Sequence, residues 1–333
     1  MNLSSSEIRR LLTTSDPTAF DELAAEARRL RDAVYGRRVF MRGLIEVSNH
    51  CRNNCLYCGI RRDARCRRYR LSVEQIMECC RVGYGLGFRT FVLQGGEDGW
   101  FSDEVVCGLV REMKVQYPDC AVTLSLGERG RESFARLREA GADRYLLRHE
   151  TADARHYAML HPAEMSFTHR MECLHDLREL GYQVGAGFMV GSPGQTVETL
   201  LEDLAFIADF RPEMVGIGPF IPADGTPFEH EPAGSVEATL RLLAIIRILH
   251  PQVLLPATTA LGTLHPTGRE RAVEAGANVV MPNLSPQDTR ALYSIYNNKL
   301  ATGSEAAESV ADLRLRMQAI GYEVPVDRGD FKT

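Results

Sequence analysis

Three cysteines with the spacing C-x3-C-x2-C lie in one loop, and this spacing is typical of a metal or iron–sulfur site. They are Cys51, Cys55 and Cys58, and they follow directly after an apolar stretch that predicts a strand. Thiolates are soft ligands, and four of them complete a [4Fe–4S] cluster. A loop with three cysteines therefore leaves one iron atom without a protein ligand, free to bind another molecule and take part in chemistry.

Zinc binding and disulfide formation are the alternative uses of these cysteines. A structural zinc site needs four ligands, usually as two separated pairs, and the nearest candidates for a fourth are His50 and Cys66. A disulfide framework does not fit a chain of 333 residues with nine cysteines, an odd number, and no recognisable signal peptide. We therefore expect a reducing, cytoplasmic environment and favour the iron–sulfur interpretation.

The cysteine loop resembles the signature of the radical S-adenosylmethionine (SAM) superfamily, C-x3-C-x-aromatic-C, with Tyr57 as the aromatic residue. The resemblance implies a [4Fe–4S] cluster whose open iron binds the amino and carboxylate groups of SAM. In this superfamily an electron from the cluster cleaves the sulfonium and gives a 5′-deoxyadenosyl radical. The cofactors carry the difficult chemistry, and the protein holds and shields them.

Length and composition are those of one enzyme domain. With 44% hydrophobic residues the chain can bury a large core, and α/β barrels often run to about 250 residues or more as one domain. The formal net charge of −5 gives no indication of nucleic-acid binding. No apolar run is as long as a membrane span requires, so we expect no membrane partner either.

Short apolar runs alternate with longer amphipathic segments, which is typical of a parallel sheet covered by helices. Eight such runs predict a complete (β/α)8 barrel of the TIM type. The expected strands are 43–48, 90–93, 121–126, 144–148, 184–189, 214–218, 253–256 and 277–281. The expected helices are 73–86, 103–116, 131–140, 167–180, 197–210, 236–249 and 266–274, and Gly87, Gly141, Gly181 and Gly276 fit the left-handed ends of four of them.

No linker-like segment divides the chain, so we expect one domain with additions at both ends. Within the first part, a serine at 4–6 is expected to cap one helix, and Ser15 or Asp16 a second. The expected parts are an extra N-terminal helical layer over 1–36, the barrel over 37–300, and 301–333, with a turn, a helix over 304–320 and a tail.

Polar motifs follow the expected strands, where the active sites of barrel enzymes lie. Gln94-Gly95-Gly96-Glu97 follows the second strand and is similar to the Gly-Gly-Glu motif of the superfamily, which contacts the amino group of SAM. The fourth strand ends with Arg148, His149 and Glu150. Because buried charges need a partner, we expect a polar ligand there, with a ring of salt bridges as the alternative. The turn 191–196 lacks the Lys-Ser/Thr pair of a phosphate loop and is expected to shape the SAM pocket.

Longer blocks narrow the resemblance to the HydE family, radical SAM maturases that help to build the active-site cluster of [FeFe]-hydrogenase. The similar blocks are 46–62, 143–151, 215–222, 256–260 and 278–283, within a match over about residues 40 to 300. Some members of the family carry a second cysteine cluster near the C-terminus. The last cysteine here is Cys173, so we expect a single [4Fe–4S] cluster.

The resemblance implies three groups of site residues. Cys51, Cys55 and Cys58 would hold the cluster. The SAM pocket would contain Tyr57, Gln94, Gly96, Glu97, Ser125, Glu150 and Arg170, although Arg170 could equally lie on the surface. The substrate cavity would contain Thr123, Arg148, Thr258, Thr259, Met281 and Tyr293, with the arginine and the threonines forming an anion or carboxylate site.

Cys66 lies in an arginine-rich segment, residues 61–70, close to the cysteine loop. This segment has two interpretations: a solvated basic face with local acidic partners, or a docking surface for an acidic partner such as the electron donor or another maturation protein. The remaining cysteines are expected to be small buried hydrophobic residues, namely Cys79, Cys80, Cys107, Cys120 and Cys173.

The resemblance implies that the substrate is a small cysteine-bound iron carbonyl cyanide complex, delivered by a partner maturase, to which the radical adds. One alternative is an enzyme similar to methylornithine synthase or biotin synthase, with an amino-acid or thioether substrate, although the second cysteine set of biotin synthase is missing. Another is a non-catalytic iron–sulfur scaffold. A scaffold has no need to bind SAM, so the expected SAM pocket argues against it.

Overall fold

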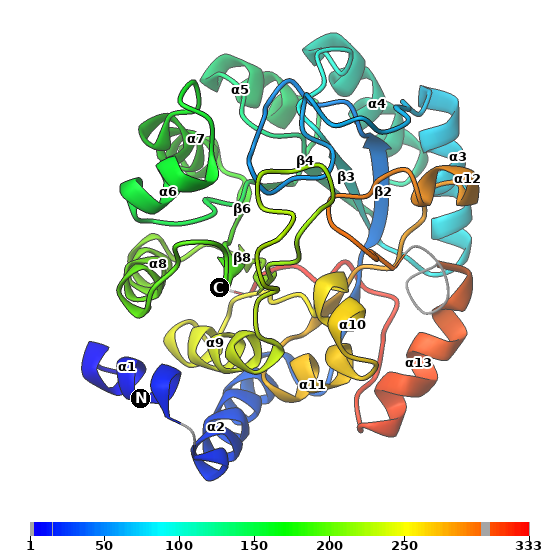
Figure 1. The fold of residues 1–333 in the computed structure, drawn as a ribbon. Coiled ribbons are helices and arrows are strands. Elements are labelled where there is room, and N and C mark those ends of the chain that lie inside the picture. The colour runs from blue at the N-terminus through cyan, green and yellow to red at the C-terminus, as the bar shows by residue number, and fades with distance from the viewer. Residues whose placement is uncertain (1–2, 15, 301–306, 333) are drawn as a thin grey trace.

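A parallel sheet of six strands forms the centre of the fold in the computed structural model, which describes residues 3–14, 16–300 and 307–332. The strand order is β2-β3-β4-β5-β6-β8, and each neighbouring pair is parallel. The carboxyl ends of the strands therefore lie at one edge of the sheet (Figure 1). The strands are β2 (Gly43–Ser48), β3 (Thr90–Gly95), β4 (Ala121–Ser125), β5 (Arg144–Leu146), β6 (Gln183–Ala186) and β8 (Met214–Val215).

Shorter pairings extend this sheet. Two parallel pairs are β1 (Phe40–Met41) with β10 (Val279–Val280), and β7 (Met189–Val190) with β9 (Gly218–Pro219). Single parallel bridges join Met214 to Leu254, Pro256 to Val279 and Leu44 to Asn283. The predicted parallel α/β architecture is confirmed, whereas the complete barrel stays a prediction because the expected strands 253–256 and 277–281 pair over very few residues.

The expected strands 184–189 and 214–218 are each divided in two, at Gly187 and at Gly216. Gly187 has a φ of 151°, and a Cβ atom on it would lie 2.0 Å from the carbonyl oxygen of Gly216. The two backbones can approach this closely only because Gly187 has no side chain. The close approach interrupts both strands, which the apolar runs alone did not reveal.

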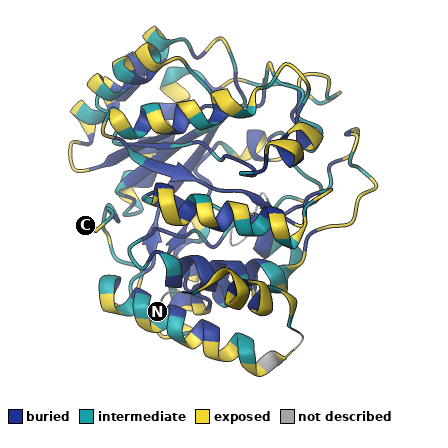
Figure 2. Ribbon diagram, turned by 90° about the vertical axis from the view of Figure 1, so that its left-hand side faces the viewer, coloured by how far each residue is buried: buried dark blue, intermediate teal, exposed yellow. Residues whose placement is uncertain are grey.

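Helices surround the sheet and turn their buried residues inwards (Figure 2). The seven expected helices are present as α3 (Val73–Gly85), α4 (Asp103–Gln116), α5 (Arg131–Glu139), α7 (Phe167–Glu179), α8 (Val197–Phe210), α9 (Val236–Leu249) and α11 (Gly268–Glu274). Glycines with positive φ follow four of them, as predicted: Gly87, Gly141, Gly181 and Gly276. Three further helices, too short to give a clear periodicity, are α6 (Ala154–Leu160), α10 (Thr259–Leu264) and α12 (Gln287–Arg290).

Helices at both ends of the chain pack on this framework. At the N-terminal end, α1 (Ser5–Thr13) begins with a capping box at Ser4, and α2 (Pro17–Tyr35) is capped by Asp16 and packs on α9. Ser15 lies outside the described residues, as do 304–306 of the expected C-terminal helix, which is observed as α13 (Val310–Ala319). No helix among the described residues is long and apolar enough to cross a bilayer.

Candidate active site

Successive side chains along a strand point to opposite faces of the sheet, one towards the cavity and the other towards the helices. On β2, Leu44 and Glu46 line an internal cavity, whereas Ile45 and Val47 join the hydrophobic core beneath the helices. The same alternation directs polar side chains from the next two strands into the cavity, namely Gln94, Thr123 and Ser125. The cavity has a volume of about 370 Å³.

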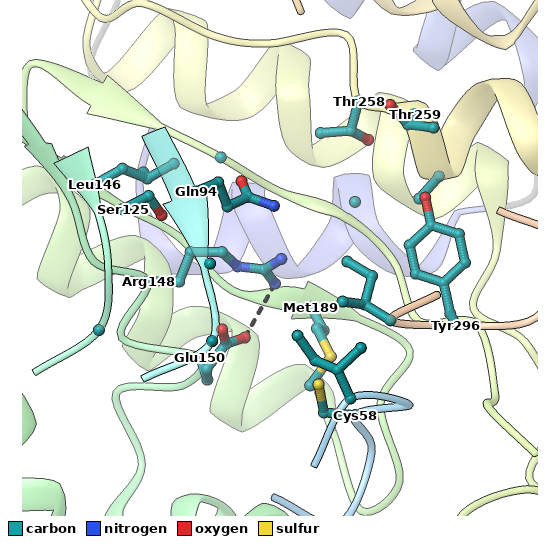
Figure 3. Close-up of a pocket in the computed structure, with 18 of the residues that line it drawn as sticks. Cys58, Gln94, Ser125, Leu146, Arg148, Glu150, Met189, Thr258, Thr259 and Tyr296 are labelled. Carbon is teal, nitrogen blue, oxygen red and sulfur yellow. Dashed lines mark ion pairs between the residues drawn. The ribbon is translucent and has the colours of Figure 1, made fainter. Parts of the chain in front are cut away.

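Every site residue that the sequence suggested lines this one cavity. The cluster group is Cys51, Cys55 and Cys58; the SAM group is Tyr57, Gln94, Gly96, Glu97, Ser125, Glu150 and Arg170; the substrate group is Thr123, Arg148, Thr258, Thr259, Met281 and Tyr293. Figure 3 shows Cys58, Glu150, Arg148 and Thr258 around the same space. The structure thus brings the three groups together, while the role of each residue stays a prediction.

The cysteine loop is held by backbone contacts and is half-buried at all three thiols. The Arg68 guanidinium donates hydrogen bonds to the carbonyl oxygens of Ile60 and Arg61, at 2.9 and 2.6 Å. Burial raises the pKa of the Cys55 thiol, and raises that of Cys58 to about 12, because a bare thiolate is poorly solvated there. Thiolate ligation to iron would compensate this cost, so three thiols in one cavity fit the expected cluster.

The zinc alternative gains no support from the part of the chain that the structure describes. There, no group of three or more His, Cys, Asp or Glu side chains is arranged to hold a single metal ion. Neither His50 nor Cys66, the two expected candidates for a fourth zinc ligand, is among the residues that line the cavity.

Tyr57 is held in place by a histidine that the sequence analysis missed. His161 Nδ1 lies 3.0 Å from the carbonyl oxygen of Tyr157, which can only accept, so Nδ1 carries the proton. His161 Nε2 therefore accepts the hydrogen bond from the Tyr57 hydroxyl, at 3.2 Å. Burial lowers the pKa of His161 to about 3, which keeps the ring neutral and preserves this arrangement.

Glu97 and Arg170 are fixed by their neighbours. The Glu97 carboxylate accepts hydrogen bonds from Arg52 Nε and from the backbone N–H of Glu128, both at 2.9 Å. Arg170 is 7% exposed, donates to the carbonyl oxygen of Arg148 at 2.6 Å, and pairs with Glu128 at 2.5 Å. The alternative that Arg170 lies on the surface is therefore wrong.

Several buried polar atoms in the cavity have no hydrogen-bond partner. Arg148 Nη2 and Glu150 Oε2 form an ion pair of 3.0 Å (Figure 3), but the buried Arg148 Nε has no hydrogen-bond partner. The hydroxyls of Thr123 and Thr258 also lack one. Buried polar groups are normally satisfied, so this cavity favours a polar ligand over a closed ring of salt bridges.

The sequence analysis missed two further charged groups in the cavity. Arg42 is 5% exposed, and its Nε and Nη2 atoms have no hydrogen-bond partner. It lies two positions before the inward-facing Leu44, so strand alternation could have identified it. Lys299 pairs with the buried Glu46 at 2.6 Å, but no local signal connects two residues so far apart in the sequence. His149, which the sequence analysis grouped with Arg148 and Glu150, is fully buried and does not line the cavity.

Known proteins with similar sequences identify the family. A family model described as the radical SAM superfamily matches residues 45–207, which include the cysteine loop. The chain is 43% identical to the [FeFe] hydrogenase maturase subunit HydE of Thermotoga maritima, over 98% of this chain and 93% of that protein. The chain belongs to the HydE family of radical SAM enzymes. Its enzymes use a [4Fe–4S] cluster and SAM, as predicted.

Two comparisons extend beyond the HydE family. The chain is 29% identical to the 3-methylornithine synthase of Methanosarcina acetivorans, over 99% of this chain and 93% of that protein. Among solved structures, the crystal structure of methylornithine synthase (PylB) aligns with a TM-score of 0.88 at 27% identity, covering 97% of this chain and 94% of that chain. The fold over nearly the whole chain is thus similar to that of methylornithine synthase.

Proposed function

We propose that this HydE-family enzyme acts in the assembly of the [FeFe]-hydrogenase active-site cluster. The observation that carries the proposal is the 43% identity to a HydE subunit over nearly the whole chain. The cavity supports it, because the cysteine loop faces the same space as several buried polar atoms without a hydrogen-bond partner, namely Arg148 Nε and the hydroxyls of Thr123 and Thr258. When bound, the reduced cluster and SAM supply an electron for sulfonium cleavage and hence a 5′-deoxyadenosyl radical.

The residues around the cavity would hold the cluster and SAM and would shield the radical. Cys51, Cys55 and Cys58 would ligate the cluster. Tyr57, Gln94, Gly96, Glu97, Ser125, Glu150 and Arg170 would hold SAM. The cavity is also lined by buried apolar side chains such as Val92 and Phe220, which would help to shield a reactive primary radical.

The proposed substrate is a small cysteine-bound iron carbonyl cyanide complex, to which the radical adds. Its carboxylate would lie at Arg148, whose planar guanidinium can donate two parallel hydrogen bonds. The hydroxyls of Thr123, Thr258 and Thr259 would add donors without adding charge, and Met281 and Tyr293 would border the ligand. Arg42, which is buried and lines the same cavity, would place a second guanidinium near an anionic substrate.

The finer description of the fold belongs to the same proposal. We infer that the bridges through Leu254, Val279 and Leu44 complete an eight-stranded barrel around the cavity. Residues 1–36 and 301–333 would then be additions packed outside the barrel of residues 37–300. A closed barrel would restrict access to the carboxyl-terminal edge of the strands.

The proposed partners are a reducing electron donor and other hydrogenase maturation proteins. The arginine-rich segment would contact an acidic partner, because Arg65 and Arg67 are exposed beside the cysteine loop. Part of the segment is already used, since Arg68 binds carbonyl oxygens and Arg70 pairs with Asp98 at 2.6 Å. If three of these arginines can be reversed to Glu with no loss of partner-dependent turnover, the docking proposal fails.

A methylornithine-synthase-like activity is the second candidate. It is favoured by the TM-score of 0.88 to that enzyme and by an arginine that suits an amino-acid carboxylate. Biotin-synthase-like chemistry would lack the second cysteine set, and a non-catalytic scaffold would have no use for the SAM residues. Supplying either lysine or the cysteine-bound iron complex to the reduced enzyme distinguishes the two candidates by their products.

The test is anaerobic reconstitution with iron and sulfide, followed by electron paramagnetic resonance (EPR) of the reduced protein with and without SAM. We expect a [4Fe–4S]+ signal that shifts on adding SAM, and 5′-deoxyadenosine as a product. Both should be lost in Cys55→Ala. A cluster that is indifferent to SAM would overturn the enzymatic proposal and favour a scaffold.

A further inference from the structure

Glu150 has a backbone conformation that glutamate rarely adopts. Its φ is 65°, in the left-handed region, where a side chain other than that of glycine is strained. Only two other described residues besides glycine, Arg211 and Asn298, have positive φ, and neither lines the cavity. This conformation places the Glu150 carboxylate in the cavity beside Arg148 (Figure 3). Surrounding contacts must therefore hold it, since the residue type does not favour it.

The first contacts come from Gly187, between β6 and β7. Its carbonyl oxygen accepts a hydrogen bond from the backbone N–H of Glu150, at 3.0 Å. Its own N–H donates to His149 Nδ1, at 3.2 Å. Gly187 is therefore hydrogen-bonded to both His149 and Glu150.

The tautomer of His149 follows from this hydrogen bond. Since Nδ1 accepts from Gly187, the proton of the neutral ring lies on Nε2. Nε2 faces Asp203 Oδ1 on α8, at 3.3 Å, and both side chains are fully buried. The ring also packs edge-on against Phe206 of α8, with 4.7 Å between centroids. His149 thus connects the turn to α8 and faces away from the cavity.

Asp203 also holds the far side of the same turn. Its Oδ1 accepts a hydrogen bond from the backbone N–H of Ala152, at 2.6 Å. A fully buried carboxylate is costly unless polar groups surround it. The groups beside the Asp203 carboxylate are His149 Nε2 and the backbone N–H of Ala152. The carboxylate therefore contacts the turn both before Glu150, at His149, and after it, at Ala152.

We propose that His149 and Asp203 are positioning residues that hold Glu150 in its left-handed conformation and so aim its carboxylate at SAM. The inference rests on the proposed role of Glu150 in the SAM pocket. Neither residue touches the ligand; both act through the turn 149–152. Without them the turn can relax, and the Glu150 carboxylate leaves the position that Arg148 and the cavity define.

The test measures SAM affinity of the cluster-loaded enzyme by equilibrium dialysis, together with the SAM-induced shift of its EPR signal. We expect His149→Phe and Asp203→Leu to keep their iron but to bind SAM about tenfold more weakly, the order of the cost of a left-handed non-glycine residue. Asp203→Asn should bind SAM almost normally, since its amide oxygen still accepts from the backbone N–H of Ala152 and still faces His149 Nε2. The matched control is His250→Phe. Like His149, His250 is buried, contacts the backbone and does not line the cavity, although its partner is the carbonyl oxygen of Pro212.

Combining Asp203→Leu with Glu150→Gln distinguishes a loss of SAM affinity that acts through Glu150 from a general disturbance of the fold. In Glu150→Gln, which already weakens the contact with SAM, adding Asp203→Leu should cause little further loss. An equal loss in both backgrounds, or normal SAM binding in both His149→Phe and Asp203→Leu, would overturn the inference. If Glu150→Gln alone binds SAM normally, the proposed role of Glu150 fails, and the inference fails with it.

Discussion

Replacing Gly96 by alanine should push the cysteine loop away from the end of β3, because the added methyl group has no room between them. A Cβ atom on Gly96 would lie 2.2 Å from the carbonyl oxygen of His50 and 2.8 Å from Cβ of Cys51. Ordinary contact begins at about 3.4 Å, so Gly96→Ala requires the end of β3 and the loop to move apart by roughly 1 Å. The atom in the way is backbone, which cannot rotate aside as a flexible side chain would.

Overpacking of this kind costs about 1–3 kcal/mol. If the strain is relieved by displacing the loop, the geometry that binds the cluster becomes roughly 5- to 150-fold less populated. We therefore expect Gly96→Ala to retain its fold but to take up much less iron during anaerobic reconstitution. Iron and sulfide content per chain, with the absorbance of the cluster, measures the effect without any need for SAM.

Gly99→Ala is the matched control. It adds the same methyl group three positions later, where no atom lies within 4 Å of the added Cβ. We expect normal iron content and an unchanged melting temperature in this variant. If Gly96→Ala also bound iron normally and melted at the wild-type temperature, the described packing of the cysteine loop on β3 would be refuted.

Three further changes test the interior. Lys299→Met should destabilise the fold by about 3–5 kcal/mol in urea unfolding, because it leaves Glu46 charged and buried without its partner, and adding Glu46→Gln should recover much of the loss. The pKa of His161 is lowered to about 3 in the folded chain, so its neutral ring stabilises the fold fully above about pH 6.5, and this stabilisation is lost as the pH falls from 6.5 towards 3. The free energy of unfolding of the cluster-free chain should therefore fall by about 2–3 kcal/mol by pH 4.5. The same drop in pH should lower the free energy of unfolding of His161→Phe by less. Thr258→Val should leave the melting temperature unchanged, because the hydroxyl has no protein partner, but should lower maturation turnover about tenfold if a ligand uses it.

Local spacing predicted the cysteine loop, and the resemblance to a known family supplied most of the other site residues. The three cysteines and Gly96 lie in short motifs whose meaning does not depend on the rest of the chain. The inward direction of Thr123 follows from its position on a strand, and the helix-ending role of Gly141 follows from its residue type. These features are determined within a few residues, so they can be read before the fold is known.

The features that could not be predicted depend on contacts between distant segments. Lys299 is 253 positions from Glu46, and His161 is 104 positions from Tyr57, so neither pairing leaves a local pattern. The division of the expected strand 184–189 at Gly187 has the same origin, because it depends on how closely the carbonyl oxygen of Gly216 approaches. Such contacts become visible only when the sheet is assembled.

The segment Arg148-His149-Glu150 contains both kinds of information. Alternation along an extended chain puts Arg148 and Glu150 on one side and His149 on the other, so the outward direction of His149 could have been predicted. The left-handed backbone of Glu150 could not, because glutamate does not favour it and no neighbouring residue requires it. It exists because Gly187 and Asp203, from two other parts of the chain, hold the turn from both sides. The position of the carboxylate is therefore a property of the folded structure, and Asp203→Leu, although Asp203 does not line the cavity, should weaken SAM binding.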